Sequence, residues 1–245
     1  MSETVHDATA PNQPVDGTRA WEAWRAERHR SLTAPTGNLA LVETRWIPDG
    51  RRPDLDAERA ARPDGITVTS VERTDLVTGE PEYGLRVWDA HSSAIEHFRH
   101  TEVFPYDPDW VIDASYTPVT GARTVAFEHL RDNGGTRQKV VPGDIALTLD
   151  GRDHTLSAFD DDGTLLLVFG DPTNGTSTYG AGRFLFVTHA GPGRVTLDFN
   201  RAFVPPCGYS DQYNCPMPPR ENRLHLPVEA GEKRPVFRDG FPAQS

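Results

Sequence analysis

Short runs of β-prone residues alternate with turn residues along most of the chain, and this alternation limits the fold more than any other feature. Asn133-Gly134-Gly135, Asp150-Gly151 and Asp162-Gly163 separate such runs, and they favour hairpin turns because Gly and Asn tolerate a positive φ. The pattern predicts a mainly β fold, an antiparallel β-sandwich or barrel. From residue 66 onward we expect eleven strands, at residues 66–71, 83–88, 110–116, 124–129, 138–141, 145–149, 154–159, 165–169, 184–188, 194–199 and 224–228.

One helix is expected ahead of these strands. Residues 21–32 carry tryptophan and arginine side chains at helical spacing, with Thr18 as the N-cap and Pro35 as the stop. Residues 39–46 follow as a further strand candidate. The N-terminal helix is therefore expected to dock on a β body.

The two ends of the chain differ in composition from its middle. Residues 1–18 are polar and contain Pro and Gly, so we expect a disordered tail there, and residues 237–245 are expected to form a second tail. Residues 19–236 are expected to form one β-rich domain, since all-β domains often reach this size.

The charge of the chain argues against two classes of partner. The 245 residues carry a formal net charge of -11, which repels nucleic-acid phosphates and anionic lipid head groups. No apolar run reaches the roughly 20 residues that cross a bilayer. Residues 1–13 do not show a basic region followed by an apolar stretch, so we expect a cytoplasmic protein.

Residues 168–234 depart from the plain β pattern and form the candidate site segment. Asp171 follows a buried-looking strand, and Thr173 lies in the loop of small and hydroxylated residues that comes next. Tyr179 and Arg183 close this loop. Together these groups suit an anionic or hydroxylated ligand, because an arginine forks onto carboxylate or phosphate. The alternative is a turn closed by an Asp–Arg ion pair.

Further polar residues are expected on strands. Asp198 and Asn200 lie two residues apart, which puts them on one face of a strand, where buried polar groups need hydrogen bonds or a function. Arg86, if it points inward, needs a carboxylate partner, and Asp171 or Asp198 are the candidates.

A long proline-rich loop near the C-terminus carries both cysteines. Cys207 and Cys215 could form a bridge, stay as buried thiols, bind a metal with His225 or Asp198, or include a reactive thiol. The spacing does not match the short Cys pairs of structural zinc sites. No motif in the sequence indicates a cofactor.

Several long motifs resemble one known family. They are D-x-T-x-G-x-x-T-Y-G-A-G-R-F-L from Asp171, L-D-F-N-R-A-F-x-P-P-C from Leu197, C-P-x-P-P-x-E-N-R-L from Cys215, and A-G-E-K from Ala230. Over about residues 20–234 the chain resembles the prokaryotic family called domain of unknown function 1684. That family name carries no activity, so the resemblance implies no catalytic role.

The residue inventory leads to three hypotheses. The first is a site for a small polar or anionic metabolite, with hydrolysis or isomerisation as candidate reactions. The second is a binding module without catalysis, and the third is that the polar motifs are purely structural. In the first, Asp171, Asp198 and Tyr179 are the catalytic candidates. The substrate-binding candidates are Arg86, Arg183, Thr173, Asn200, Asn222 and Lys233.

Overall fold

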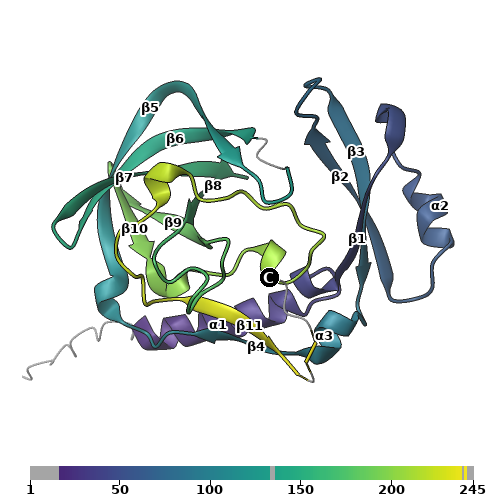
Figure 1. Cartoon of the computed structure of the whole chain (residues 1–245), viewed down its shortest axis with the longest axis horizontal. Coiled ribbons are helices and arrows are strands. Elements are labelled where there is room, and N and C mark those ends of the chain that lie inside the picture. Colours follow the sequence, from purple (N-terminus) through teal and green to yellow (C-terminus); the bar gives the residue numbers. More distant parts are fainter. Residues whose placement is uncertain (1–16, 133–135, 239, 242–245) are drawn as a thin grey trace, which may run out of the picture.

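A computed structural model describes residues 17–132, 136–238 and 240–241, and it confirms a mainly β chain built around a closed barrel (Figure 1). Six antiparallel strands close in the order β10-β5-β6-β7-β8-β9. The barrel is thus the correct one of the two expected architectures. Its strands are β5 (Val111–Glu128), β6 (Thr136–Leu149), β7 (Arg152–Asp161), β8 (Thr164–Phe169), β9 (Arg183–Gly191) and β10 (Arg194–Asp198).

Apolar side chains fill the inside of the barrel. Ile145, Leu147 and Leu149 alternate along β6 and face inward, as the period of two along a strand requires. Leu167 of β8 and Leu197 of β10 belong to the same core. Because apolar side chains fill the interior, we expect a ligand site outside the barrel interior.

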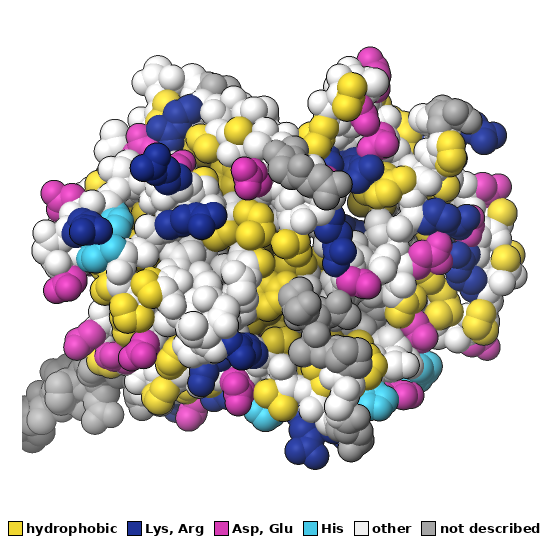
Figure 2. Space-filling model, viewed as in Figure 1, with side chains coloured by type: hydrophobic (Ala, Val, Ile, Leu, Met, Phe, Trp, Pro, Cys, Tyr) yellow, Lys and Arg dark blue, Asp and Glu magenta, His cyan; other side chains and the backbone are white. Residues whose placement is uncertain are grey.

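Two smaller sheets flank the barrel. β3 (Pro81–Asp89) lies between β1 (Leu41–Trp46) and β2 (Ile66–Thr74) in a three-stranded sheet beside it. β4 (Phe98–Val103) pairs with β11 (Glu232–Phe237). In Figure 2 a hollow with hydrophobic side chains lies between the barrel and the three-stranded sheet, and charged side chains of both signs are scattered around it.

Helices cover the outside of this framework. α1 (Gly17–Leu32) runs along the β4–β11 ribbon beneath the barrel, while the short helices α2 (Leu55–Ala60) and α3 (Ser93–His97) lie near the three-stranded sheet (Figure 1). A second core packs Leu41, Phe98, Phe127 and Phe184 together, so it joins both small sheets to the outer barrel wall. No helix in the described part of the chain is long and apolar enough to cross a membrane.

Some strand predictions need correction. Residues 110–116 and 124–129 belong to one strand, β5, which continues through an irregularity between Pro118 and Arg123. Residues 138–141 and 145–149 likewise belong to one strand, β6. Residues 224–228 form no strand, because the segment from 199 to 231 is held by side chains and short turns.

The predictions at the ends have mixed outcomes. Thr18 lies inside α1 and is not its N-cap. Residues 1–16 and 242–245, and the expected turn at 133–135, lie outside the described residues. Phe237, assigned above to a tail, is the last residue of β11.

Candidate functional site

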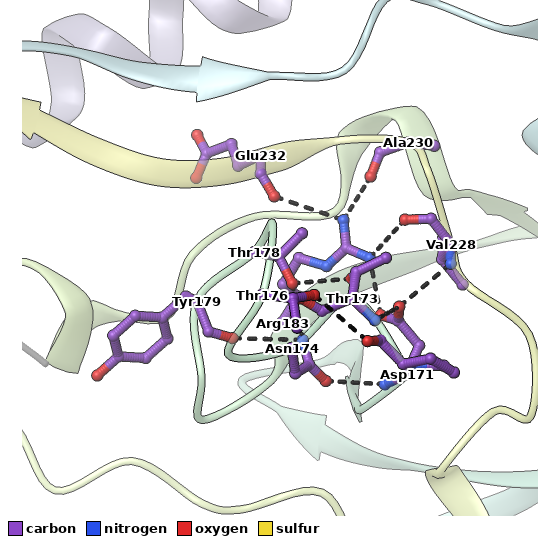
Figure 3. Close-up of polar contacts among 11 residues, drawn as sticks. Asp171, Thr173, Asn174, Thr176, Thr178, Tyr179, Arg183, Val228, Ala230 and Glu232 are labelled. Atoms are coloured by element: carbon purple, nitrogen blue, oxygen red, sulfur yellow. Dashed lines mark hydrogen bonds and ion pairs between the residues drawn. The ribbon is translucent and has the colours of Figure 1, made fainter.

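Asp171 and Arg183 meet at one end of the barrel, where β8 ends and β9 begins (Figure 3). Arg183 Nη2 lies 2.9 Å from Asp171 Oδ2, and both side chains are 0% exposed. Asp171 Oδ1 also accepts hydrogen bonds from the backbone N–H groups of Thr173 (2.9 Å) and Val228 (3.2 Å). This ion pair is the one expected above under the alternative that the loop is a turn closed by an Asp–Arg pair.

Both terminal nitrogens of Arg183 also bind main-chain carbonyls of the C-terminal segment, whereas its buried Nε has no partner among the described residues. Its Nη2 donates to Val228 O at 2.8 Å, and its Nη1 donates to Ala230 O and to Glu232 O. Burial lowers the pKa of Arg183, and the Asp171 carboxylate opposes that change. The guanidinium thus ties residues 228–232 to the barrel, and a ligand would have to displace these carbonyls to reach it.

The loop after Asp171 is held in shape by hydrogen bonds among its own residues. Thr173 Oγ1 and Thr178 Oγ1 are 2.9 Å apart, and Asn174 accepts from the Asp171 N–H at 2.8 Å. Gly182 has φ +92°, and a Cβ there would lie 2.6 Å from Pro218 Cγ. Gly182 thus allows a close chain contact in a backbone conformation that favours glycine.

Tyr179 points away from Arg183 (Figure 3) and belongs to a different cluster. Its hydroxyl donates to Cys207 Sγ at 3.7 Å, and burial raises the pKa of Tyr179. Cys207 and Cys215 are both buried, free thiols. Arg86 lies near them, with its guanidinium 5.1 Å from the centre of the Tyr213 ring.

The other predicted residues occupy further separate places. Asp198 Oδ1 accepts from the backbone and side-chain nitrogens of Asn200, which is fully buried and also bonds the backbone of Asp107. Asn222 bonds the backbone of Ser157 and Val168. Lys233 Nζ lies 5.2 Å from the centre of the Phe104 ring.

The predicted set therefore divides into several small networks. Asp171, Thr173 and Arg183 lie together, as do Asp198 and Asn200. Asp171 pairs with Arg183 and Asp198 with Arg201, so neither is the partner of Arg86. Across the residues with described positions, no three His, Cys, Asp or Glu side chains are grouped to bind a metal.

Residues 96–233 match the family model described as "Protein of unknown function (DUF1684)". The chain belongs to the DUF1684 family. The match spans the barrel and the C-terminal segment, whereas α1 and the three-stranded sheet precede it.

Comparison with known proteins adds no activity. A solution NMR structure of an uncharacterized protein of Haloarcula marismortui is similar, with 33% identity over 56% of this chain and 77% of that chain and a TM-score of 0.46. Among proteins with curated descriptions no match is found.

A cleft that the sequence did not suggest lies between α1 and the outer wall of the DUF1684 barrel. We call it the α1 cleft, and its volume is about 710 Å³. Sequence reasoning missed it because its two walls are far apart in the chain. Its lining comes from Trp24, Glu27, Arg28 and Ser31 of α1 and from Val111, Phe186, Thr188, Thr196, Asp198, Arg201 and Phe203.

Behind the cleft, Arg28 of α1 takes part in a buried charge network. Its Nε lies 3.2 Å from Glu232 Oε1, and its Nη2 donates to Val204 O at 2.9 Å. Glu232 Oε2 accepts from the Val204 N–H and from the Tyr209 hydroxyl. The pKa of Arg28 is raised overall. Burial alone would lower this pKa, but the neighbouring Glu232 and Tyr209 together have the larger effect. Arg28 is therefore held in one position at the edge of the α1 cleft.

Proposed function

We propose that this DUF1684 chain is a non-catalytic binding module, which holds a small ligand with a flat apolar body and one acidic or carbonyl group in the α1 cleft. The observation that carries the proposal is the aromatic floor of the cleft beside the fixed Arg28. A cleft of this size, mostly apolar with a few placed polar groups, is the usual form of a small-molecule site.

The apolar part of the ligand would lie on the barrel wall. Phe186 points outward from β9 and is 49% exposed, and its ring stacks on Phe203 with centroids 5.4 Å apart. Trp24 and Val111 extend this surface on either side. The exposed Phe186 ring and the half-buried Trp24 thus leave apolar area in the cleft that a ligand can cover.

The acceptor group of the ligand would meet Arg28. The Arg28 guanidinium lies 4.8 Å from the centre of the Phe203 ring, so the charge and the aromatic floor are in contact. Its Nε donates to Glu232 and its Nη2 to Val204 O, and the same side chain lines the cleft. A carboxylate or carbonyl oxygen of a ligand in the cleft would accept a charge-assisted hydrogen bond from this guanidinium.

The carboxylates favour binding over catalysis. Asp198 Oδ2 lies 3.1 Å from Arg201 Nε, and its Oδ1 accepts a hydrogen bond from the Asn200 N–H. Glu27 forms an ion pair with Arg30. Asp171 is bound to Arg183 at the barrel end. A general base needs an acceptor within reach of the substrate proton, and these carboxylates are already used. The polar motif residues of the C-terminal segment thus fit the hypothesis of a purely structural role. The case for ligand binding comes from the α1 cleft instead.

The test uses anilinonaphthalene sulfonate, which has a flat aromatic body and an anionic group. We expect saturable fluorescence enhancement at one site on the folded protein. Phe186→Ala should weaken the affinity by about tenfold or more, since a covered Phe side chain contributes roughly 1.5–3 kcal/mol. The matched control is Val140→Ala on β6, because Val140 is 48% exposed and lies outside the cleft.

Equal affinity for both variants and wild type would refute the α1 cleft as the binding site. Unfolding in urea, measured for each variant, distinguishes a lost site from a lost fold. Binding only in partly unfolded samples would also contradict the proposal.

A further inference from the structure

The two cysteines lie side by side although no disulfide joins them. Cys207 sits in the turn Pro206–Gly208, and Cys215 follows at the far end of the next loop. The Cys207 N–H donates to Cys215 Sγ at 3.3 Å, so the two residues are in direct contact. The ends of the loop are thus already in contact, which removes most of the chain movement that forming a bond would need.

The surroundings favour a thiolate at one of the two sulfurs. The Tyr179 hydroxyl donates to Cys207 Sγ at 3.7 Å. Arg131, which donates to Tyr213 O, and Arg86 place positive charge near the thiols. Arg86 Nε is buried and has no hydrogen-bond partner within the described ranges.

The two thiols are not equivalent. The hydrogen bond from the Cys215 thiol is the largest cause that lowers the pKa of Cys207, and the Tyr179 hydroxyl adds to it against burial. The pKa of Cys215 is raised because its thiol proton is held by Cys207 and because it is buried. The Tyr179 hydroxyl, which donates to Cys207 Sγ and not to Cys215, points in the same direction, so Cys207 is the candidate nucleophile and Cys215 the candidate partner.

We propose that Cys207 and Cys215 form a peroxide-reactive dithiol. The Cys207 thiolate attacks one oxygen of hydrogen peroxide, the O–O bond breaks, and hydroxide leaves and takes up a proton to become water. Cys207 is then a sulfenic acid. The Cys215 sulfur attacks the Cys207 sulfur, the S–O bond breaks, and the Cys215 proton leaves with the hydroxyl as a second water. Both sulfurs are oxidised, peroxide is reduced, and a disulfide remains.

Burial sets which oxidants can react. Cys207 and Cys215 are 2% and 6% exposed, so a molecule the size of water has far better access than a bulky disulfide. The loop that the disulfide would close also holds β1 to the rest of the molecule, through Ser210 on Leu41 O and Gln212 on the Thr44 N–H. Oxidation would therefore fix a segment that joins the three-stranded sheet to the barrel side. This inference does not depend on the α1 cleft.

The experiment treats the reduced full chain with hydrogen peroxide and follows intact mass and thiol number. We expect the loss of two hydrogen masses and of both thiols, a Cys207–Cys215 crosslinked peptide, and full reversal by dithiothreitol. In Cys215→Ala, Cys207 loses the hydrogen bond of the Cys215 thiol but keeps that of Tyr179, so dimedone should still trap a sulfenic acid at Cys207, and faster than at Cys215 in Cys207→Ala. Tyr179→Phe should slow the wild-type reaction by roughly threefold, since it removes one hydrogen bond to the thiolate.

Three results would overturn the inference. They are two thiols that survive peroxide, a disulfide between two chains, and overoxidation of Cys207 without a crosslink. If an alanine variant fails to fold, the mass and peptide measurements on the wild type still decide. Equal trapping rates at the two cysteines would overturn the assigned roles, and faster reaction with oxidised glutathione than with peroxide would overturn the selection by size.

Discussion

Replacing Arg183 with methionine tests whether the Asp171–Arg183 pair is a structural lock. Methionine keeps much of the length and apolar volume of the arginine stem, so the change chiefly removes the charge and the donors. It leaves the Asp171 carboxylate buried with two backbone N–H groups and no counter-ion. It also removes the donor from the carbonyls of Val228 and Ala230.

The expected loss is large. Removing one partner of a buried pair costs about 3–5 kcal/mol, because the other charge stays buried and uncompensated. An unsatisfied buried carbonyl adds about 1–3 kcal/mol where water cannot reach it. Native domains are stable by only about 5–15 kcal/mol, so Arg183→Met should lose at least a third of the stability or prevent folding. The double variant Arg183→Met/Asp171→Asn should recover part of the loss, since no unpaired charge remains.

Urea unfolding followed by circular dichroism measures these changes. The control is Arg194→Met on the same barrel. Arg194 pairs with Asp113, but both side chains are more than half exposed, at 60% and 58%. Exposed pairs contribute about 0–1 kcal/mol, so this variant should unfold close to wild type. A loss for Arg183→Met no greater than for Arg194→Met, together with lost ligand binding, would refute the lock and restore Arg183 as a ligand contact.

Two further predictions concern buried polar groups. Asn222→Leu should cost about 2–4 kcal/mol in urea unfolding, because Asn222 serves the backbone of Ser157 and Val168; an unchanged midpoint would contradict this. Burial lowers the pKa of His129, so the unfolded chain binds this proton first and stability falls as pH drops below about 6.5. His129→Asn should lose less stability than wild type between neutral and mildly acidic pH, and equal slopes would show that His129 does not contribute.

The local features of the fold could be read from the sequence. Asp150-Gly151 and Asp162-Gly163 form the β6–β7 and β7–β8 turns, and all four residues have positive φ, as a type I′ hairpin requires. The Asp–Arg pair was also within reach, because its members are only twelve residues apart. These features depend on neighbours in the chain, which is what a single sequence shows best.

Features that depend on distant partners were missed. β4 and β11 pair across more than 120 residues, and their sequences, FRHTEV and EKRPVF, show little apolar alternation. The choice between sandwich and barrel depends on the contact of β10 with β5 as well as β9, which no local pattern encodes. The Arg28–Glu232 pair spans 204 residues, so neither the pair nor the cleft beside it left a sequence signal.

The polar motifs have a physical reason that is separate from ligand binding. Residues 199–231 form no regular strand, so apart from isolated bridges such as Phe184 with Phe203 their backbone groups lack the ladder bonds that a sheet would give. Buried side chains supply hydrogen bonds in their place. Arg183 donates to the carbonyls of Val228 and Ala230, and Glu232 accepts from the Val204 N–H. Most hydrogen-bonding groups of such a motif residue find protein partners when the chain folds. A charged side chain that also lines a cleft is therefore a better guide to function, and Arg28, which lines the α1 cleft and contacts the Phe203 ring, is such a group.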